Sequence, residues 1–551
     1  PILGHVGDVE DRDASIKTRY LALRRHAGAP FATPLGIGVV RATIDEALPY
    51  VRNASDVAAL NELRAQQTWP DWHDVVQADE GRLTAEPGAI EAFESGDLTH
   101  PYSKLAVGVH RIYSRHKIPR DPKVFHGTFS VDGQTVAYTG RRIEMYVSLP
   151  GKPSVKMTAL EFERDDAGPN EATVVFQGGG PGASSGWYLS GGMAPIMVDD
   201  SGELVQNNDT MLRGARLLFL DGVGTGDSFT NGEEESYFNT KDDADIRTEF
   251  LKQYRADNAS RLGQSRFFLT GTSFTVQAVG RMVEHLTDEG IPIGGIFLVS
   301  GAMSYQLLDF ESESVVSYAC ALAPYAATAR YHLPEMQAQH PDEAKFLEEV
   351  QKFAFETYLP AIANGPPLET QEPERFATIA QTLSDYIGLP VELIKEKHLQ
   401  ISQMDFCTVL LPGETIAALD GRMKTRSVPE DAGRDPFVYV LDELVAKNEK
   451  GLTHFYRKVV GYHPVEEVNR RYVVLDPLFK RWDWGKHDNT PPRVQDYIIR
   501  IVQKNPEIVV SVSGGKLDLR TPEPVNRYLV NHLPPDVAKQ FEFHTYEGGQ
   551  I

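Results

Sequence analysis

The sequence contains little cysteine. Only two cysteines, Cys320 and Cys407, occur in 551 residues, which excludes a small scaffold held together by disulfides. One disulfide between these two cysteines is an alternative, but we expect two buried thiols. The chain also lacks a CxxC pair, an HExxH motif and a cluster of histidines and acids, so we expect no metal and no other cofactor.

Positive charge and long apolar runs are scarce as well. The 55 lysines and arginines face 77 acidic residues, for a net charge of −22. Nucleic acid and anionic membrane surfaces require a basic face, so neither is an expected partner. No window reaches the roughly 18–20 uncharged apolar residues that span a bilayer. The opening PILGHVGDVEDRD has no basic segment followed by an apolar one, so we expect a soluble cytoplasmic protein rather than a secreted one.

Apolar periodicity divides the chain into segments. Helical spacing without any chemical motif predicts that residues 1–118 form a helical N-terminal extension. From about residue 120 the period changes to two, punctuated by DG, PG and AG turns, which predicts an antiparallel meander. Short solid apolar runs follow, among them ATVVFQ, ARLLFL, SRFFLT and GGIFLVS. Such runs are typical of parallel strands that are buried on both faces.

A long interval with few strand signals separates FLVSG from PEIVVSV. It contains helical stretches and proline-rich joints, which indicates a cap inserted between strands of one sheet. We therefore predict an α/β fold with its first core segment at 119–310, a mainly helical cap at 311–495 and the last core strands at 496–551. The oligomeric state stays open, a homo-oligomer included.

The segment FFLTGTSFTVQ has the layout of a nucleophile elbow. A buried strand runs into Gly271-Thr272-Ser273-Phe274, and a helical stretch follows at once. Such a turn exposes a serine hydroxyl at a helix N-terminus, where developing negative charge is stabilised. Thr275 stands where the G-x-S-x-G motif has its second glycine. Alone, this segment is also compatible with an ordinary helix cap.

Three further pieces follow the chain order of a hydrolase. The glycine-rich VVFQGGGPG lets backbone amides approach a ligand, and it lacks the GK[ST] of a phosphate-binding loop. Asp518 lies just beyond a late apolar run, where an acid would orient a base. The chain then ends in YEGGQI. Serine, acid and base loop in this order indicate acyl-transfer or hydrolytic chemistry.

Together these motifs resemble serine carboxypeptidases of the S10 peptidase family, and its bacterial-type branch in particular. The resemblance runs from about residue 120 to the end, through the segments GGPGASSGWYLSGGMAP, LLFLDGVGTGDSF, GTSF, GGKLDLRTP and YEGGQI. It implies an α/β-hydrolase fold with a cap. It also implies Ser273 as the nucleophile, Asp518 as the acid and the amides of Gly180 and Phe274 as the oxyanion hole, with Gln550 at the position of the catalytic histidine.

The positions implied to bind substrate depart from the family pattern. They hold Phe176, Gly178, Gly179, Gly192 and Thr272. The family uses a tryptophan, an asparagine and acidic side chains to bind the free carboxylate of a peptide. The resemblance thus implies a substrate other than a simple peptide C-terminus, in the class of small-molecule, acyl or peptide-like compounds.

Gln550 decides how much hydrolysis to expect. Glutamine has no nitrogen that titrates near neutral pH and cannot act as base and then acid. Loss of the base should cost on the order of 10⁴–10⁶ in kcat. The nearby His544 belongs to the strand-like FEFHTY, and we do not expect it to reach Ser273.

Three explanations of Gln550 are open: natural divergence, an introduced change, or a chain that is cut short. We favour natural divergence, with hydrolysis impaired and the site redirected to cyclisation, elimination or acyl transfer. The alternatives are a catalytically silent binding protein and an inactivated variant of a true serine carboxypeptidase.

Overall fold

The computed structural model describes residues 76–79, 82–85, 123–230, 234–308, 310, 314–426, 441–461, 481–484 and 494–550. The predicted helical extension therefore lies outside the described residues, apart from the antiparallel pair β1 (Val76–Asp79) and β2 (Arg82–Ala85). The chain forms two compact units. The first comprises 1–171, 181–263 and 448–482, and the second 172–180, 264–447 and 483–551. The segment boundaries given above stay predictions.

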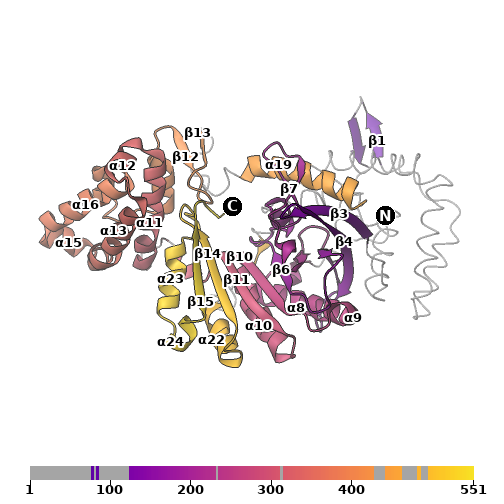
Figure 1. Ribbon diagram of the computed structural model, residues 1–551. Coiled ribbons are helices and arrows are strands. Elements are labelled where there is room, and N and C mark those ends of the chain that lie inside the picture. The colour runs from indigo at the N-terminus through magenta and orange to yellow at the C-terminus, as the bar shows by residue number, and fades with distance from the viewer. Residues whose placement is uncertain are drawn as a thin grey trace. The chain divides into compact units, whose positions relative to one another are not determined.

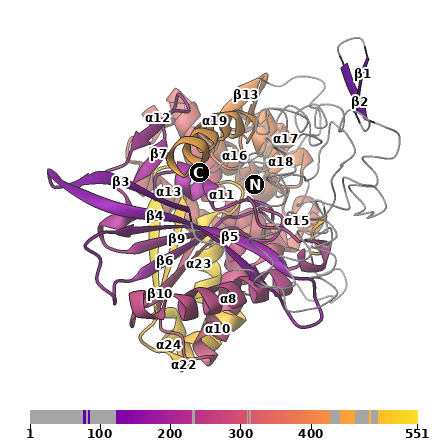
Figure 2. The ribbon, with the colours of Figure 1, turned by 90° about the vertical axis from the view of Figure 1, so that its right-hand side faces the viewer.

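Four antiparallel strands form the sheet of the first unit. They follow the order β9-β5-β4-β3, and Figure 2 shows the long strands β4 and β5 beside each other. Asp132 and Gly133 join β3 to β4 with φ of 50° and 81°, the left-handed turn that an Asp-Gly pair favours. The bounds are β3 Lys123–Val131, β4 Gln134–Val147, β5 Val155–Arg164 and β9 Arg216–Leu220. This confirms the antiparallel meander.

Shorter elements complete the first unit. They are α7 (Gly186–Ser190), the hairpin β7 (Ile196–Val198) and β8 (Leu204–Gln206), α8 (Thr240–Asp257) and α9 (Ala259–Leu262), with single turns at Met211–Arg213 and Glu234–Tyr237 and a π-helical turn at Phe455–Val459. α19 (Leu441–His454) precedes the π-helical turn.

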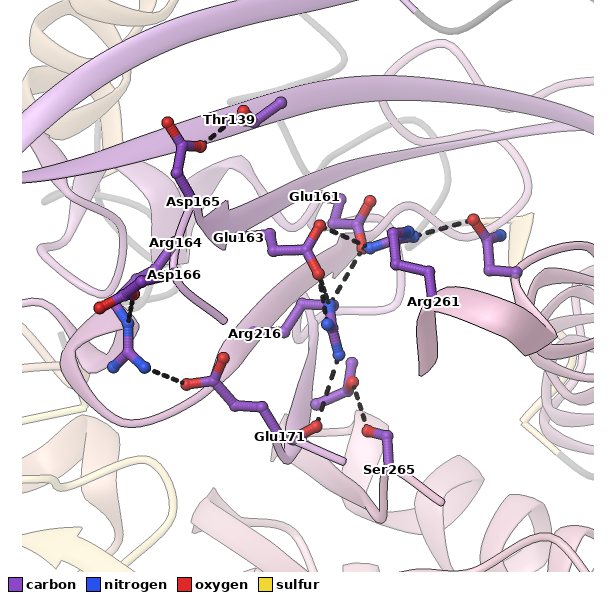
Figure 3. Close-up of polar contacts among 12 residues, drawn as sticks. Thr139, Glu161, Glu163, Arg164, Asp165, Asp166, Glu171, Arg216, Arg261 and Ser265 are labelled. Atoms are coloured by element: carbon purple, nitrogen blue, oxygen red, sulfur yellow. Dashed lines mark hydrogen bonds and ion pairs between the residues drawn. The ribbon is translucent and has the colours of Figure 1, made fainter. Parts of the chain in front are cut away.

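Charged side chains line one part of this sheet (Figure 3). Glu161 and Glu163 of β5 are buried, and Arg216 of β9 is 1% exposed. Arg216 Nε donates to Glu163 Oε1 over 2.9 Å. Arg141 and Arg261 also donate to Glu163, each over 2.9 Å. The acids and bases satisfy one another, so this network is a structural element of the sheet.

Five parallel strands form the sheet of the second unit. They follow the order β6-β10-β11-β14-β15, and Figure 1 shows β10, β11, β14 and β15 running together. Their bounds are β6 Thr173–Gln177, β10 Phe267–Ser273, β11 Ile293–Gly301, β14 Val509–Gly515 and β15 Phe541–Tyr546. The solid apolar runs are these parallel strands, as predicted.

Helices pack beside this sheet. They are α10 (Thr275–Asp288), α22 (Val494–Lys504), α23 (Glu523–Asn531) and α24 (Pro535–Ala538). α10 and α22 lie close together because Gly280 has no side chain: a Cβ there would stand 3.0 Å from Val494 Cγ2 and 3.1 Å from Tyr497 Cβ. A glycine inside a helix is disfavoured by itself, so this close contact explains its presence.

A helical region lies between β11 and β14 in the sequence and has its own apolar core. Within that core the rings of Tyr325 and Phe406 stack 4.2 Å apart, and both cysteines are buried and unbonded to each other. The helices are α11 Val315–His332, α12 Pro334–Gln339, α13 Glu343–Phe353, α14 Leu359–Asn364, α15 Pro366–Gln371, α16 Pro373–Ile387, α17 Val391–Glu396 and α18 Gln403–Val409. The hairpin β12 (Glu414–Ile416) and β13 (Lys424–Arg426) follows α18. None of the described helices is long and apolar enough to cross a membrane.

Candidate active site

The carboxyl ends of the five parallel strands carry the predicted site. The glycine-rich loop follows β6, Ser273 ends β10, Asp518 follows β14 and Gln550 follows β15. Gly178–Gly180 of the loop, Ser273, Asp518 and Gln550 belong to the second unit. Parallel strands present their carboxyl ends at one edge of the sheet, which is where ligands bind in open α/β sheets.

Ser273 occupies a strained turn between β10 and α10. Its φ is 53°, a left-handed conformation that a residue with a side chain rarely adopts. Gly271 makes the turn tight: a Cβ there would stand 2.9 Å from the Cα of Val276 in the helix. The Ser273 hydroxyl makes no hydrogen bond with any residue that the structure describes. The geometry is that of a nucleophile elbow.

The glycine-rich loop lies against this serine. A Cβ on Gly179 would stand 3.1 Å from the Thr272 carbonyl oxygen and 3.3 Å from Ser273 Cβ. Gly180 has a φ of 109°, which requires glycine. Since the loop approaches the elbow this closely, the prediction that the amides of Gly180 and Phe274 form an oxyanion hole is compatible with the backbone.

Asp518 is fully buried. Its Oδ1 accepts hydrogen bonds from the amides of Arg520 at 3.0 Å and Thr521 at 2.9 Å, and its Oδ2 accepts one from the Thr521 hydroxyl at 2.7 Å. The Ser300 hydroxyl also donates to this carboxylate. Burial raises the pKa of Asp518 to about 6, although these donors act to lower it. The acid is therefore held firmly by its own loop and by β11.

Gln550 has a fixed backbone and an unsatisfied side chain. Its amide donates to the Leu419 carbonyl over 2.6 Å. Its side-chain Oε1 is buried and accepts no hydrogen bond from the described residues. The donors to Asp518 come from Ser300, Arg520 and Thr521 instead. Position 550 is thus connected by its backbone alone, without the acid–base pairing of a triad.

The predicted substrate-binding positions fall in both units. Phe176 is buried at 2% exposure on β6, and Gly178 follows the strand. The Thr272 hydroxyl is buried and has no hydrogen-bond partner among the described residues. Gly192 belongs to the first unit, where its φ is 99° and its carbonyl accepts a hydrogen bond from Asn207. Of these positions, Thr272 contributes a polar group directly beside the nucleophile.

Two features of the site carry no sequence motif. The Phe274 ring meets the edge of Trp484 at 5.8 Å between centroids, and Tyr305 meets Trp484 at 5.4 Å. The Tyr305 hydroxyl is buried without a partner in the described chain, and burial raises its pKa. The second feature is Ser300, whose φ of 43° marks it as another strained strand end. The paired aromatics of RWDWGK, which include Trp484, could stack a flat ligand but are more often ordinary packing, and nothing in the sequence around Ser300 distinguishes it.

The hydrogen bonds and ion pairs of the described histidines do not include one to Ser273. His544 lies on β15 with 48% of its side chain exposed and stands 3.9 Å from the Glu542 carboxylate. His285 lies in the last turn of α10, far along the helix from Ser273. His463 and His487 lie outside the described residues.

The parallel sheet with its flanking helices, the elbow and the order of serine, acid and terminal loop are those of the α/β-hydrolase fold. Residues 146–303 match the family model of serine carboxypeptidases, Peptidase S10. That segment includes Ser273 and the glycine-rich loop but neither Asp518 nor Gln550. Over this segment the chain is similar to serine carboxypeptidases, in agreement with the resemblance drawn from its motifs.

Individual relatives are distant. The chain is 26% identical over 269 residues to the pheromone-processing carboxypeptidase KEX1 of Pyricularia oryzae, a match that covers 43% of this chain and 38% of that relative. Among solved structures, the Saccharomyces cerevisiae Kex1(Δ)p, a prohormone-processing carboxypeptidase, is matched at 14% identity with a TM-score of 0.43, over 75% of this chain and 78% of the other. A thermostable carboxyl esterase from Bacillus coagulans is matched at 12% identity with a TM-score of 0.30, over 74% and 91%.

Proposed function

We propose that this chain performs acyl-type chemistry at Ser273 and hydrolyses its substrate poorly. The observation that carries the proposal is the contrast between two parts of the site. Ser273 stands in a strained elbow against Gly179, as a nucleophile requires, whereas Gln550 Oε1 has no partner among the described residues. Together these two observations support a site that keeps its nucleophile and lacks its base.

Chemistry limits what such a site can do. When a serine attacks an acyl carbon, its proton must pass to a base, and glutamine cannot accept it near neutral pH. The oxyanion donors alone leave about 10³-fold acceleration over water. Cyclisation, elimination or acyl transfer suits the site better than hydrolysis. In such a reaction the substrate itself can carry the group that accepts the proton. The substrate is a small-molecule, acyl or peptide-like compound, and Thr272 argues against a simple peptide C-terminus.

One observation favours a second candidate, a catalytically silent binding protein. The Asp518 carboxylate already accepts hydrogen bonds from Ser300, Arg520 and Thr521, so the acid has a structural task without any base to orient. In that case the elbow and the glycine loop serve ligand recognition only.

The labelling rate of Ser273 by a fluorophosphonate, followed by intact mass, separates these functions. Three chains are compared: the chain as it stands, Gln550→His, and Ser273→Ala as the control for labelling elsewhere. Slow labelling that rises by about 100-fold or more in Gln550→His supports an intact elbow lacking only its base. Slow labelling in both chains contradicts acyl chemistry and leaves the binding protein. Fast labelling of the unchanged chain contradicts the account of a missing base.

A further inference from the structure

A short segment between β12 and β13 joins the two loops that carry Asp518 and Gln550. We call residues Ala417–Gly421 the bridging segment. The Ala418 carbonyl accepts the Leu519 amide at 3.0 Å, and the Leu419 carbonyl accepts the Gln550 amide at 2.6 Å. The Gly421 amide in turn donates to the Leu517 carbonyl over 2.8 Å. One stretch of backbone therefore contacts both loops.

These contacts hold Asp518 from both sides. Leu517 and Leu519 each bond the bridging segment, and the Leu517 amide also donates to the Gly548 carbonyl over 2.8 Å. The packing is tight as well, since a Cβ on Gly549 would stand 2.3 Å from the Leu419 carbonyl oxygen. A shift of the bridging segment would thus move the acid and position 550 together.

His332 fixes the bridging segment to the helical region. Its ring Nε2 lies 2.7 Å from the Gly421 carbonyl oxygen. A carbonyl can only accept, so Nε2 carries the proton and donates. Burial lowers the pKa of His332, with the Gly421 hydrogen bond acting in the opposite direction. Thr328, one turn earlier on α11, packs so closely that a Cβ on Gly421 would stand 2.3 Å from its Oγ1.

We propose that His332 is a positioning residue of the active site. Through the bridging segment, it sets where the Asp518 loop and the backbone of residue 550 stand relative to each other. This inference rests on the proposed function in one respect: a change at His332 alters the reaction rate at Ser273 only if residue 550 takes part in the reaction. Catalytic groups displaced by about 1 Å lose on the order of 100-fold in rate, so a contact this far from Ser273 matters.

The test uses the full chain with Gln550→His, in which position 550 has a base again. His332→Ala removes the donor, and His332→Gln keeps a donor nitrogen near the place of Nε2. Tyr358→Phe is the matched control, because the buried Tyr358 hydroxyl also donates to a carbonyl of the helical region, that of Leu399, over 2.7 Å. The first readout is the labelling rate of Ser273 by a fluorophosphonate. The second is residue-resolved hydrogen exchange at the amides of Leu519 and Gln550.

We expect His332→Ala to lower the labelling rate by about 10- to 100-fold and to speed exchange at both amides. His332→Gln should restore both, and Tyr358→Phe should change neither. The inference is overturned if exchange at Leu519 and Gln550 is unchanged in His332→Ala, or if Tyr358→Phe has the same effect. His332→Leu, which fills the volume without a donor, takes the place of His332→Ala if that variant does not fold.

The two readouts separate the inference from the proposed function. If Gln550→His does not speed labelling, the proposed function fails, and the exchange experiment, performed on the unchanged chain, still decides whether His332 holds the two loops. If labelling is rescued while exchange does not respond to His332→Ala, the proposed function stands and the inference fails.

Discussion

The hydroxyl of Thr275 donates a hydrogen bond to the carbonyl of Gly178. Thr275 is the first residue of α10, and Gly178 begins the glycine-rich loop. The threonine that interrupts the G-x-S-x-G motif therefore connects the elbow helix to the loop that faces Ser273. The departure from the motif adds a contact where glycine has none.

Loss of this contact should loosen the loop. In Thr275→Val the shape is kept and the buried Gly178 carbonyl loses its donor, so we expect a loss of about 1–3 kcal/mol in the free energy of unfolding and slower labelling of Ser273. Thr275→Ser keeps the hydroxyl and should stay close to the unchanged chain in both respects. Equal labelling rates for the valine and serine variants would show that the contact does not position the loop.

Strain at Ser273 should be measurable as stability. Ser273 has a φ of 53°, which glycine adopts more easily than alanine. The free energy of unfolding of Ser273→Gly, measured by denaturant titration, should therefore exceed that of Ser273→Ala by about 1 kcal/mol. Thr378, exposed in the interior of α16, is the control, because helix propensity makes alanine better than glycine there by about 1 kcal/mol. The same order of stability at both positions would mean that the elbow stores no strain.

The buried network of the first unit should be costly to break. Burial raises the pKa of Glu163, but the Arg216 hydrogen bond and the charges of Arg216, Arg261 and Arg141 outweigh it and lower the pKa overall. Glu163→Gln should therefore lose about 3 kcal/mol at neutral pH. A lowered pKa means that this stability is present above the pKa of the unfolded chain and disappears on acidification. The cost should thus shrink towards low pH in denaturant titrations.

Asp166→Asn is the control for this experiment. Asp166 pairs with Arg164 at the same end of the sheet, but its side chain is 76% exposed. Exposed pairs contribute under about 1 kcal/mol. A loss in Asp166→Asn equal to that in Glu163→Gln would indicate a local packing effect instead of a buried charge network.

The contribution of Asp221 to stability should depend on pH in the direction opposite to that of Glu163. Burial raises its pKa to about 6, although Ser185 donates to its carboxylate. The folded chain then binds the proton more tightly than the unfolded one, so this contribution to stability is full below about pH 4 and is lost as the pH rises through 6. Asp221→Asn has no such loss. Its stability relative to the unchanged chain should improve by up to about 3 kcal/mol between pH 4 and pH 7, and a constant difference would contradict the raised pKa.

Local sequence patterns predicted much of the fold. Glycine spacing and apolar runs indicate tight turns and strand ends. Turns and strand ends are determined by residues that are adjacent in the sequence, so a local pattern is enough to predict them. The α/β class and the antiparallel meander are confirmed on this basis. The two buried thiols follow from composition in the same way.

The connections between loops could not be predicted. The bridging segment acts through backbone amides and carbonyls, which every residue has, so AALDG shows no pattern that distinguishes it. The Ser300 contact with Asp518 joins residues far apart in the chain, and the serine itself is unremarkable. The Thr275 hydroxyl looks like a defect in the motif until its acceptor, Gly178, is seen.

The insertion of the helical region between β11 and β14 has a consequence for how the protein is made. During synthesis the elbow and β11 leave the ribosome first, then the entire helical region, and only then the strands that carry Asp518 and Gln550. β11 and β14 are neighbours in the sheet, so closing that pair requires a very long loop, which slows folding. Until then the edge of β11 that later pairs with β14 has no strand beside it, and an unpaired edge of this kind invites association with other chains. The chain thus completes its site last and depends on the helical region's early folding to bring the sheet together.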